Sequence, residues 1–151
     1  MRGFLDQITK KVSDLKETGV TLKLSKEMIL QILQTQIKEE SLSISSVEFK
    51  DELLIINGVK KQMMVRVKFS IVLIPVGGEK RVLHFKVKRV KPIHNEWLIN
   101  KILNDKSPHL SYSDHILSMD LAQVEKVKSI PVGNFKNAEI RDGRLLVKIG
   151  L

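Results

Sequence analysis

A few residues of this sequence have types that could support catalysis, but their spacing argues against it. The histidines lack the i, i+4 spacing with which one helix presents two zinc ligands. Residues that are adjacent in a strand or loop point apart, so Ser113-Asp114-His115 cannot form a catalytic relay. These four histidines are His84, His94, His109 and His115.

The glycines that follow Pro75 belong to a turn rather than to a phosphate-binding loop. The GxxxxGK[ST] pattern is absent, and no helix follows residues 75–80 to offer its N-terminus to a phosphate. We therefore expect a protein that is not an enzyme and that uses no metal and no cofactor.

Composition narrows the class of protein further. The chain has 151 residues, 42% of them hydrophobic and 28% charged, which predicts a single folded domain with a sizeable core. No cysteine is present, so disulfides and thiolate metal sites are excluded. Asp6 interrupts the apolar run that a signal peptide would need, and no stretch reaches the ~18 apolar residues of a membrane span. We expect a cytoplasmic protein.

Positive charge is the strongest functional indication, since 26 Lys and Arg against 17 Asp and Glu give a formal net charge of +9. Much of it falls on residues 60–91. We expect an anionic membrane surface to be the target, although a solvated face, an acidic partner or nucleic acid would also account for the charge. The side chains expected to contact lipid headgroups are Arg66, Lys68, Lys86 and Lys88.

Nucleic acid is the least favoured of these partners. Proteins that bind single strands stack bases on exposed aromatic rings, and Phe69 and Phe85 fall on the inward-facing side of their strands. What remains is a weak attraction to a nucleic-acid backbone.

Two helices are predicted in the first 40 residues. Residues 4–18 form a narrow apolar stripe, which favours an amphipathic helix laid on the domain or on a partner chain. Ser25 is a good N-cap for a second helix that runs to Glu39, and its apolar residues span about 200° of the helix circumference. Gln36 lies within that arc, so it must find a hydrogen-bond partner or face a polar opening.

Beyond residue 41 the hydrophobic period changes to that of strands. Alternation predicts strands at 43–49, 52–57, 63–74, 80–90 and 115–121, helical segments at 95–104 and 122–128, and a closing hairpin at 135–149 that turns at Asp142-Gly143. The strand at 63–74 would span roughly 40 Å, as much as the whole domain, so we expect the sheet to curl around the second helix. The predicted fold is α+β, with a long helix cradled by a highly curved antiparallel β-sheet in residues 20–151, preceded by an N-terminal amphipathic helix in residues 1–19.

An interior of this kind would either close into a core or leave a groove for an acyl chain, and the sequence leaves both open. In the second case the residues expected to line the groove belong to the helix and to the inward faces of the strands. They are Met28, Ile32, Leu33, Gln36, Met63, Val65, Phe69, Leu83 and Phe85.

Three stretches carry a resemblance to a known family. The helix start at 24–29, the segment Ile130-Pro131-Val132-Gly133 and the strand pair at 140–147 together resemble the LmeA-like phospholipid-binding proteins, whose fold is akin to the tubular lipid-binding (TULIP) superfamily. The resemblance implies a helix wrapped by a curved sheet, and binding of phospholipid through an apolar groove.

The leading hypothesis is therefore a non-enzymatic module that binds lipid or an anionic membrane surface, located peripherally at a membrane. The rival hypothesis is a structural or protein-interaction domain that forms a homo-oligomer through residues 4–18. Weak binding to a nucleic-acid backbone is the third.

Overall fold

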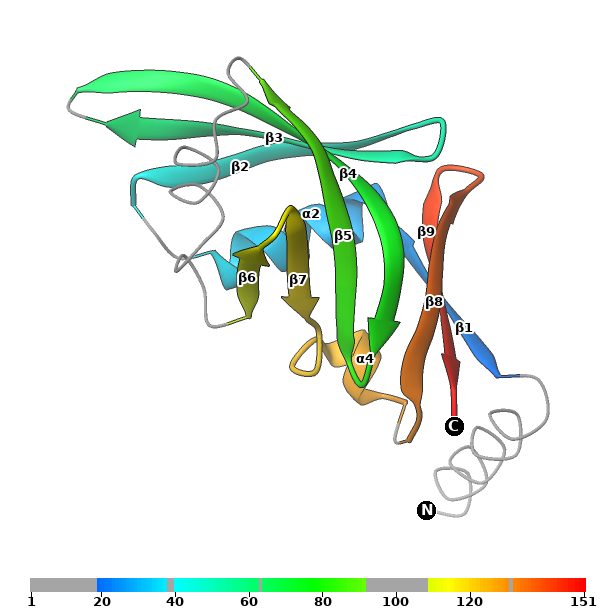
Figure 1. Ribbon diagram of the computed structural model, residues 1–151. Coiled ribbons are helices and arrows are strands. Elements are labelled where there is room, and N and C mark those ends of the chain that lie inside the picture. The colour runs from blue at the N-terminus through cyan, green and yellow to red at the C-terminus, as the bar shows by residue number, and fades with distance from the viewer. Residues whose placement is uncertain (1–18, 38–39, 63, 92–108, 131) are drawn as a thin grey trace.

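The computed structural model describes residues 19–37, 40–62, 64–91, 109–130 and 132–151 (Figure 1). The helices predicted at 4–18 and 95–104 lie outside these ranges, as does Met63. Within the described ranges, no helix has the length and apolar character needed to cross a membrane.

Antiparallel strands make up most of the described chain. A six-stranded sheet has the order β2-β3-β4-β5-β7-β6, and a three-stranded sheet has the order β1-β9-β8. The elements in chain order are β1 (Val20–Ser25), α2 (Lys26–Gln36), β2 (Leu42–Lys50), β3 (Leu53–Gln62), β4 (Val65–Glu79), β5 (Val82–Lys91), β6 (Leu110–Ser113), β7 (Ile116–Asp120), α4 (Glu125–Lys128), β8 (Asn134–Arg141) and β9 (Arg144–Gly150). The antiparallel sheet expected from the alternation is confirmed.

The core lies between the inner face of the six-stranded sheet, helix α2 and the small sheet. Leu83, Phe85 and Val87 on β5 are buried, whereas Lys86 and Lys88 between and beyond them are exposed, as their alternation predicted. The small sheet adds the alternating residues of β9 to the same core: Leu145, Val147 and Ile149.

Helix α2 begins where the sequence indicated. Ser25 is the N-cap, and its side chain accepts a hydrogen bond of 3.2 Å from the backbone N–H of Met28. The helix ends at Gln36, because Ile37 is already extended with φ −91° and ψ 104°. Ile29 and Leu33 are its buried residues, and they face the sheet.

The prediction of a long helix cradled by the sheet is wrong. The described residues contain two short helices, α2 with 11 residues and α4 with four, and are otherwise mostly antiparallel β-structure. The apolar arc was read as one buried surface, but Met28 within it is 38% exposed. The arc therefore does not measure how far the sheet surrounds the helix.

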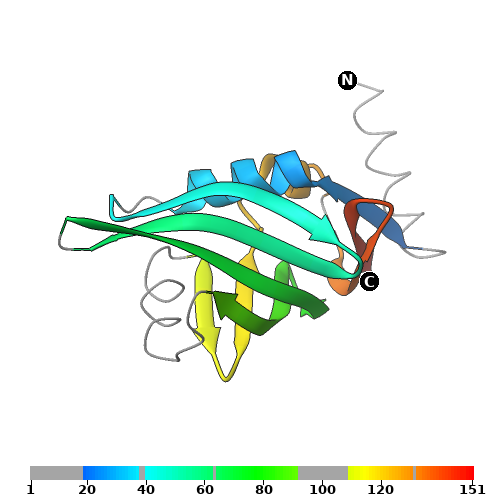
Figure 2. The same cartoon turned by 90° about the horizontal axis from the view of Figure 1, so that it is seen from above.

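Strand length is also accommodated differently from the expectation. Strand β4 has 15 residues, and it bends at two irregularities in its pairing with β5, at Val72/Leu73 and at Pro75/Gly77. Its first part, Val65 to Lys68, is exposed and projects with β3 beyond the body of the molecule (Figures 1 and 2). The extra strand length thus enters solvent instead of wrapping the helix.

Candidate functional site

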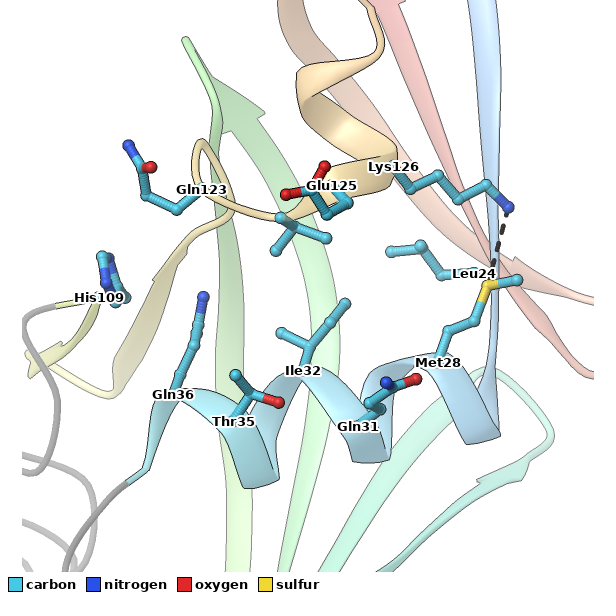
Figure 3. A pocket seen from close by; sticks show the side chains of 11 residues that line it. Leu24, Met28, Gln31, Ile32, Thr35, Gln36, His109, Gln123, Glu125 and Lys126 are labelled. Carbon is cyan, nitrogen blue, oxygen red and sulfur yellow. Dashed lines mark hydrogen bonds between the residues drawn. The ribbon is translucent and has the colours of Figure 1, made fainter.

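A groove of about 670 Å³ runs along helix α2 (Figure 3). One wall is the helix, and the opposite wall is the segment 123–126 that leads into α4. Leu24 at the end of β1 and His109 next to β6 complete the lining. The groove is thus built from segments about 100 residues apart in the sequence.

The helical wall follows from the 3.6-residue period. Positions i, i+3, i+4, i+7 and i+8 lie on one face of a helix, adjacent to the stripe that faces the core. In α2 these positions are Met28, Gln31, Ile32, Thr35 and Gln36, and all five line the groove.

The opposite wall is held by the turn between β4 and β5. The Arg81 guanidinium donates hydrogen bonds to the carbonyl oxygens of Ile130 (2.9 Å) and Val127 (3.4 Å). The backbone N–H of Leu121 donates to the Arg81 carbonyl oxygen at 2.9 Å. Burial lowers the pKa of Arg81. These bonds fix both ends of the segment that forms the wall.

Polar groups lie at both ends of the groove and along its walls. At one end, the Lys126 ammonium donates to the Lys23 carbonyl oxygen at 2.9 Å and contacts the Met28 sulfur at 3.7 Å (Figure 3). At the other end, the Gln36 amide nitrogen donates to the Asp120 carbonyl oxygen at 3.3 Å. Between them Ile32 lies on the helical wall, with Thr35 beside it and Glu125 across from it, so the middle of the groove combines apolar and polar side chains.

Gln36 meets both alternatives predicted for it, a hydrogen-bond partner and a place at a polar opening. Its Oε1 atom is buried and accepts no hydrogen bond from any described residue. A buried carbonyl oxygen without a hydrogen-bond donor lowers the stability of the fold by about 1–3 kcal/mol. Such atoms are rare in proteins unless they have a role in binding.

The residues predicted to line a lipid site are divided by the structure. Met28, Ile32 and Gln36 line the groove. Four others are buried in the core and do not line it: Leu33, Phe69, Leu83 and Phe85. Val65 is 59% exposed on the projecting part of β4, and Met63 is outside the described residues.

The space between α2 and the sheet is filled by side chains. The gap beneath the groove, bordered by Ile29, Leu83 and Phe85, holds about 10 Å³. A water molecule needs about that much accessible volume, so an acyl chain has no room there. The groove on the outer side of α2 is where a ligand can be held.

The four predicted headgroup contacts are all exposed, but they do not face the groove. Lys86 and Lys88 project from the face of β5 opposite to that of Leu83 and Phe85, which border α2. Arg66 and Lys68 lie on the projecting part of β4. The structure therefore separates the cationic surface from the groove.

The opposite wall and Leu24 were missed by the sequence analysis. Leu24 belongs to an alternating run, Val20, Leu22 and Leu24, that signals a strand and could have been found. Val124 and Lys126 carry no such signal, because their place beside α2 depends on contacts with Arg81, which lies about 40 residues earlier in the sequence.

No protein-family model matches the chain, and no curated protein or solved structure is significantly similar to it.

Proposed function

We propose that the protein binds a single-chain amphiphile, such as a fatty acid or a lysolipid, in the groove along α2. The observation that carries this proposal is the groove itself. Its volume of about 670 Å³ falls within the ~300–1,000 Å³ typical of sites that take one small molecule. A phospholipid with two acyl chains would exceed it.

The chemistry of the lining supports the same ligand class. Leu24, Ile32 and Val124 offer an apolar surface to an acyl chain, and Met28 adds a flexible thioether that adapts to it. Polar groups at both ends, with the ammonium of Lys126 at one of them, offer partners to a headgroup. The proposed single-chain ligand differs from the two-chain phospholipid that the resemblance to the LmeA-like proteins implied.

Met28→Glu is the variant that tests the proposal. Met28 occupies the third position of α2 after the Ser25 cap, where the helix dipole favours a carboxylate, so the helix is retained in this variant. The same change places a carboxylate on the groove wall next to Lys126. Removing the methionine from contact with an acyl chain should cost about 1.5–3 kcal/mol of binding free energy, roughly 10-fold to 100-fold in Kd.

The measurement is fluorescence titration with 11-(dansylamino)undecanoic acid, a single-chain probe. Val76→Glu is the matched control, because Val76 is an exposed aliphatic residue (53%) that does not line the groove. The proposal predicts weaker probe binding for Met28→Glu and unchanged binding for Val76→Glu. Equal affinities of the two variants, or no saturable binding by the wild type, would refute it.

A further inference from the structure

The tip of the β3–β4 hairpin combines exposed apolar side chains with exposed positive charge. Gln62 pairs with Val65, and Met64 lies in the turn between them. Met64 is 95% exposed, Val65 is 59% exposed and Val67 is 39% exposed. We propose that this tip (residues 61, 62 and 64–68) inserts into the interface of an anionic lipid bilayer, an activity beyond binding of an amphiphile in the groove.

Comparison with the other hairpins shows that the apolar turn is a departure from the pattern of this chain. Within the described residues, four further hairpins have two-residue turns, and each turn is polar. Their residues are Asp51 and Glu52, Lys80 and Arg81, Asp114 and His115, and Asp142 and Gly143.

Local stability does not account for methionine at this position. Met64 has φ +72°, in the left-handed region that favours Gly, Asn and Asp in two-residue hairpins. A long apolar side chain is therefore placed where both the backbone and the solvent disfavour it. Such a choice is typical of a residue whose side chain is used in binding.

The cations of the tip are arranged in an equally unfavourable way. Lys61 lies directly opposite Arg66 in the β3–β4 pairing, and like charges in directly opposed positions destabilise a sheet. Lys68 lies on the same face of β4 as Arg66. None of these three side chains has a carboxylate partner within the part of the chain that the structure describes. An anion supplied from outside would relieve this repulsion.

The two faces of the tip differ, as they do in elements that lie in a membrane interface. Val65 and Val67 alternate with Arg66 and Lys68 along β4, which gives one apolar and one cationic face. Figures 1 and 2 both show the hairpin extending past α2, so the tip can reach a surface before the body of the molecule does.

The structure also excludes the sheet centre from this contact. Lys86 pairs with Ile74, eight residues along β4 from Arg66, which is roughly 26 Å at ~3.3 Å per residue. That separation is about three times the ~8 Å Debye length at physiological salt. Lys88 lies opposite Val72/Leu73, at least four residues from Lys68, which is roughly 13 Å and still more than one Debye length. Lys86 and Lys88 therefore serve as controls for Arg66 and Lys68.

The test uses the full chain, which has no cysteine, with Met64→Cys labelled by the environment-sensitive dye NBD. Asp142→Cys in the β8–β9 turn is the control label site. With vesicles of phosphatidylcholine and about 30% phosphatidylserine, the dye at 64 should shift to the blue and brighten, and the dye at 142 should not. The response should disappear as salt rises from about 0.1 M to about 1 M.

Charge variants measured by vesicle co-sedimentation complete the test. Arg66→Gln with Lys68→Gln should weaken partitioning about 25-fold, roughly fivefold per cation, while Lys86→Gln with Lys88→Gln should change it less than about twofold. Met28→Glu in the groove should leave partitioning unchanged, so failure of this proposal is distinct from failure of the groove proposal. A silent dye at 64, an equal response to neutral vesicles, or a response to a nucleic-acid duplex but not to vesicles would overturn it.

Discussion

Arg81→Gln is expected to loosen the wall of the groove without touching its lining. The guanidinium of Arg81 donates to the carbonyl oxygens of Ile130 at 2.9 Å and Val127 at 3.4 Å, at the end of α4. Glutamine is shorter and uncharged, so it cannot reach both oxygens. The two carbonyl groups would then lose their side-chain donor. The segment 121–130 would keep only the backbone bond from the Leu121 N–H to the carbonyl oxygen of residue 81 as its hydrogen-bonded attachment to the β4–β5 turn.

The size of the effect follows from these contacts. A hydrogen bond from a charged group contributes about 1.5–3 kcal/mol, and the longer contact to Val127 adds little because it is close to the distance limit. Since Arg81 is partly exposed, we expect a loss of about 2 kcal/mol in the free energy of unfolding. For a chain of this length that corresponds to a fall in Tm of about 4–8 °C.

Thermal unfolding followed by circular dichroism measures this loss, and hydrogen exchange locates it. Amide exchange should accelerate across residues 121–130 more than across β4 or β9. Arg89→Gln is the control, because Arg89 is exposed on β5 and its side chain forms no hydrogen bond or ion pair with the described residues. If Arg81→Gln melts within about 1 °C of the wild type, or as Arg89→Gln does, the proposed support of the groove wall is wrong.

Three further variants test single features of the fold by thermal unfolding. Gly58→Ala should lower the free energy of unfolding by about 1–3 kcal/mol, because the added Cβ would lie 2.6 Å from the ring of Phe69 and 2.6 Å from a backbone oxygen. An unchanged Tm would show that the two strands can move apart to accommodate it. Met64→Asn should raise the free energy of unfolding by up to about 1 kcal/mol, since asparagine tolerates the positive φ of the turn. The same variant should lose the vesicle response. A lower Tm would contradict the assignment of the turn. Ser25→Ala should cost about 1 kcal/mol through loss of the cap on the Met28 N–H, and no loss would mean that solvent replaces it.

Pairs of strands that are close together in the sequence could be predicted, whereas pairs that are distant in the sequence could not. The closing hairpin turns at Asp142-Gly143 as predicted, because Asp-Gly supplies the positive φ that a two-residue turn needs. Strand β1 was missed although Val20, Leu22 and Leu24 alternate. Its partner β9 lies more than 100 residues later, and no local signal indicates that pairing.

The faces of α2 illustrate why only half of the site could be predicted. Met28, Ile32 and Gln36 belong to one helix, so their common face follows from helical periodicity alone. The sequence does not reveal which part of an apolar arc meets the sheet and which part meets a groove. That division depends on the segment 123–126, which is placed by long-range hydrogen bonds of Arg81.

The length of β4 led to a wrong expectation for a physical reason. A strand as long as the whole domain was assumed to be buried along its length and therefore to curl. The structure leaves residues 65–68 exposed, with valines on one face and cations on the other. Alternation in a sequence thus indicates a two-faced strand, and it does not establish that the apolar face is covered by protein.

Methyl NMR of the methionines gives the most direct test of the groove. The chain has five methionines. Among them, Met28 lies on the groove wall, Met119 is buried in the core and Met64 is at the hairpin tip. With ¹³C-methyl methionine in the full chain and dodecanoic acid added below its micelle concentration, we predict a saturable shift of the Met28 resonance while those of Met119 and Met64 stay in place. A Met28 resonance that does not move, or a shift largest at Met119, would contradict the account.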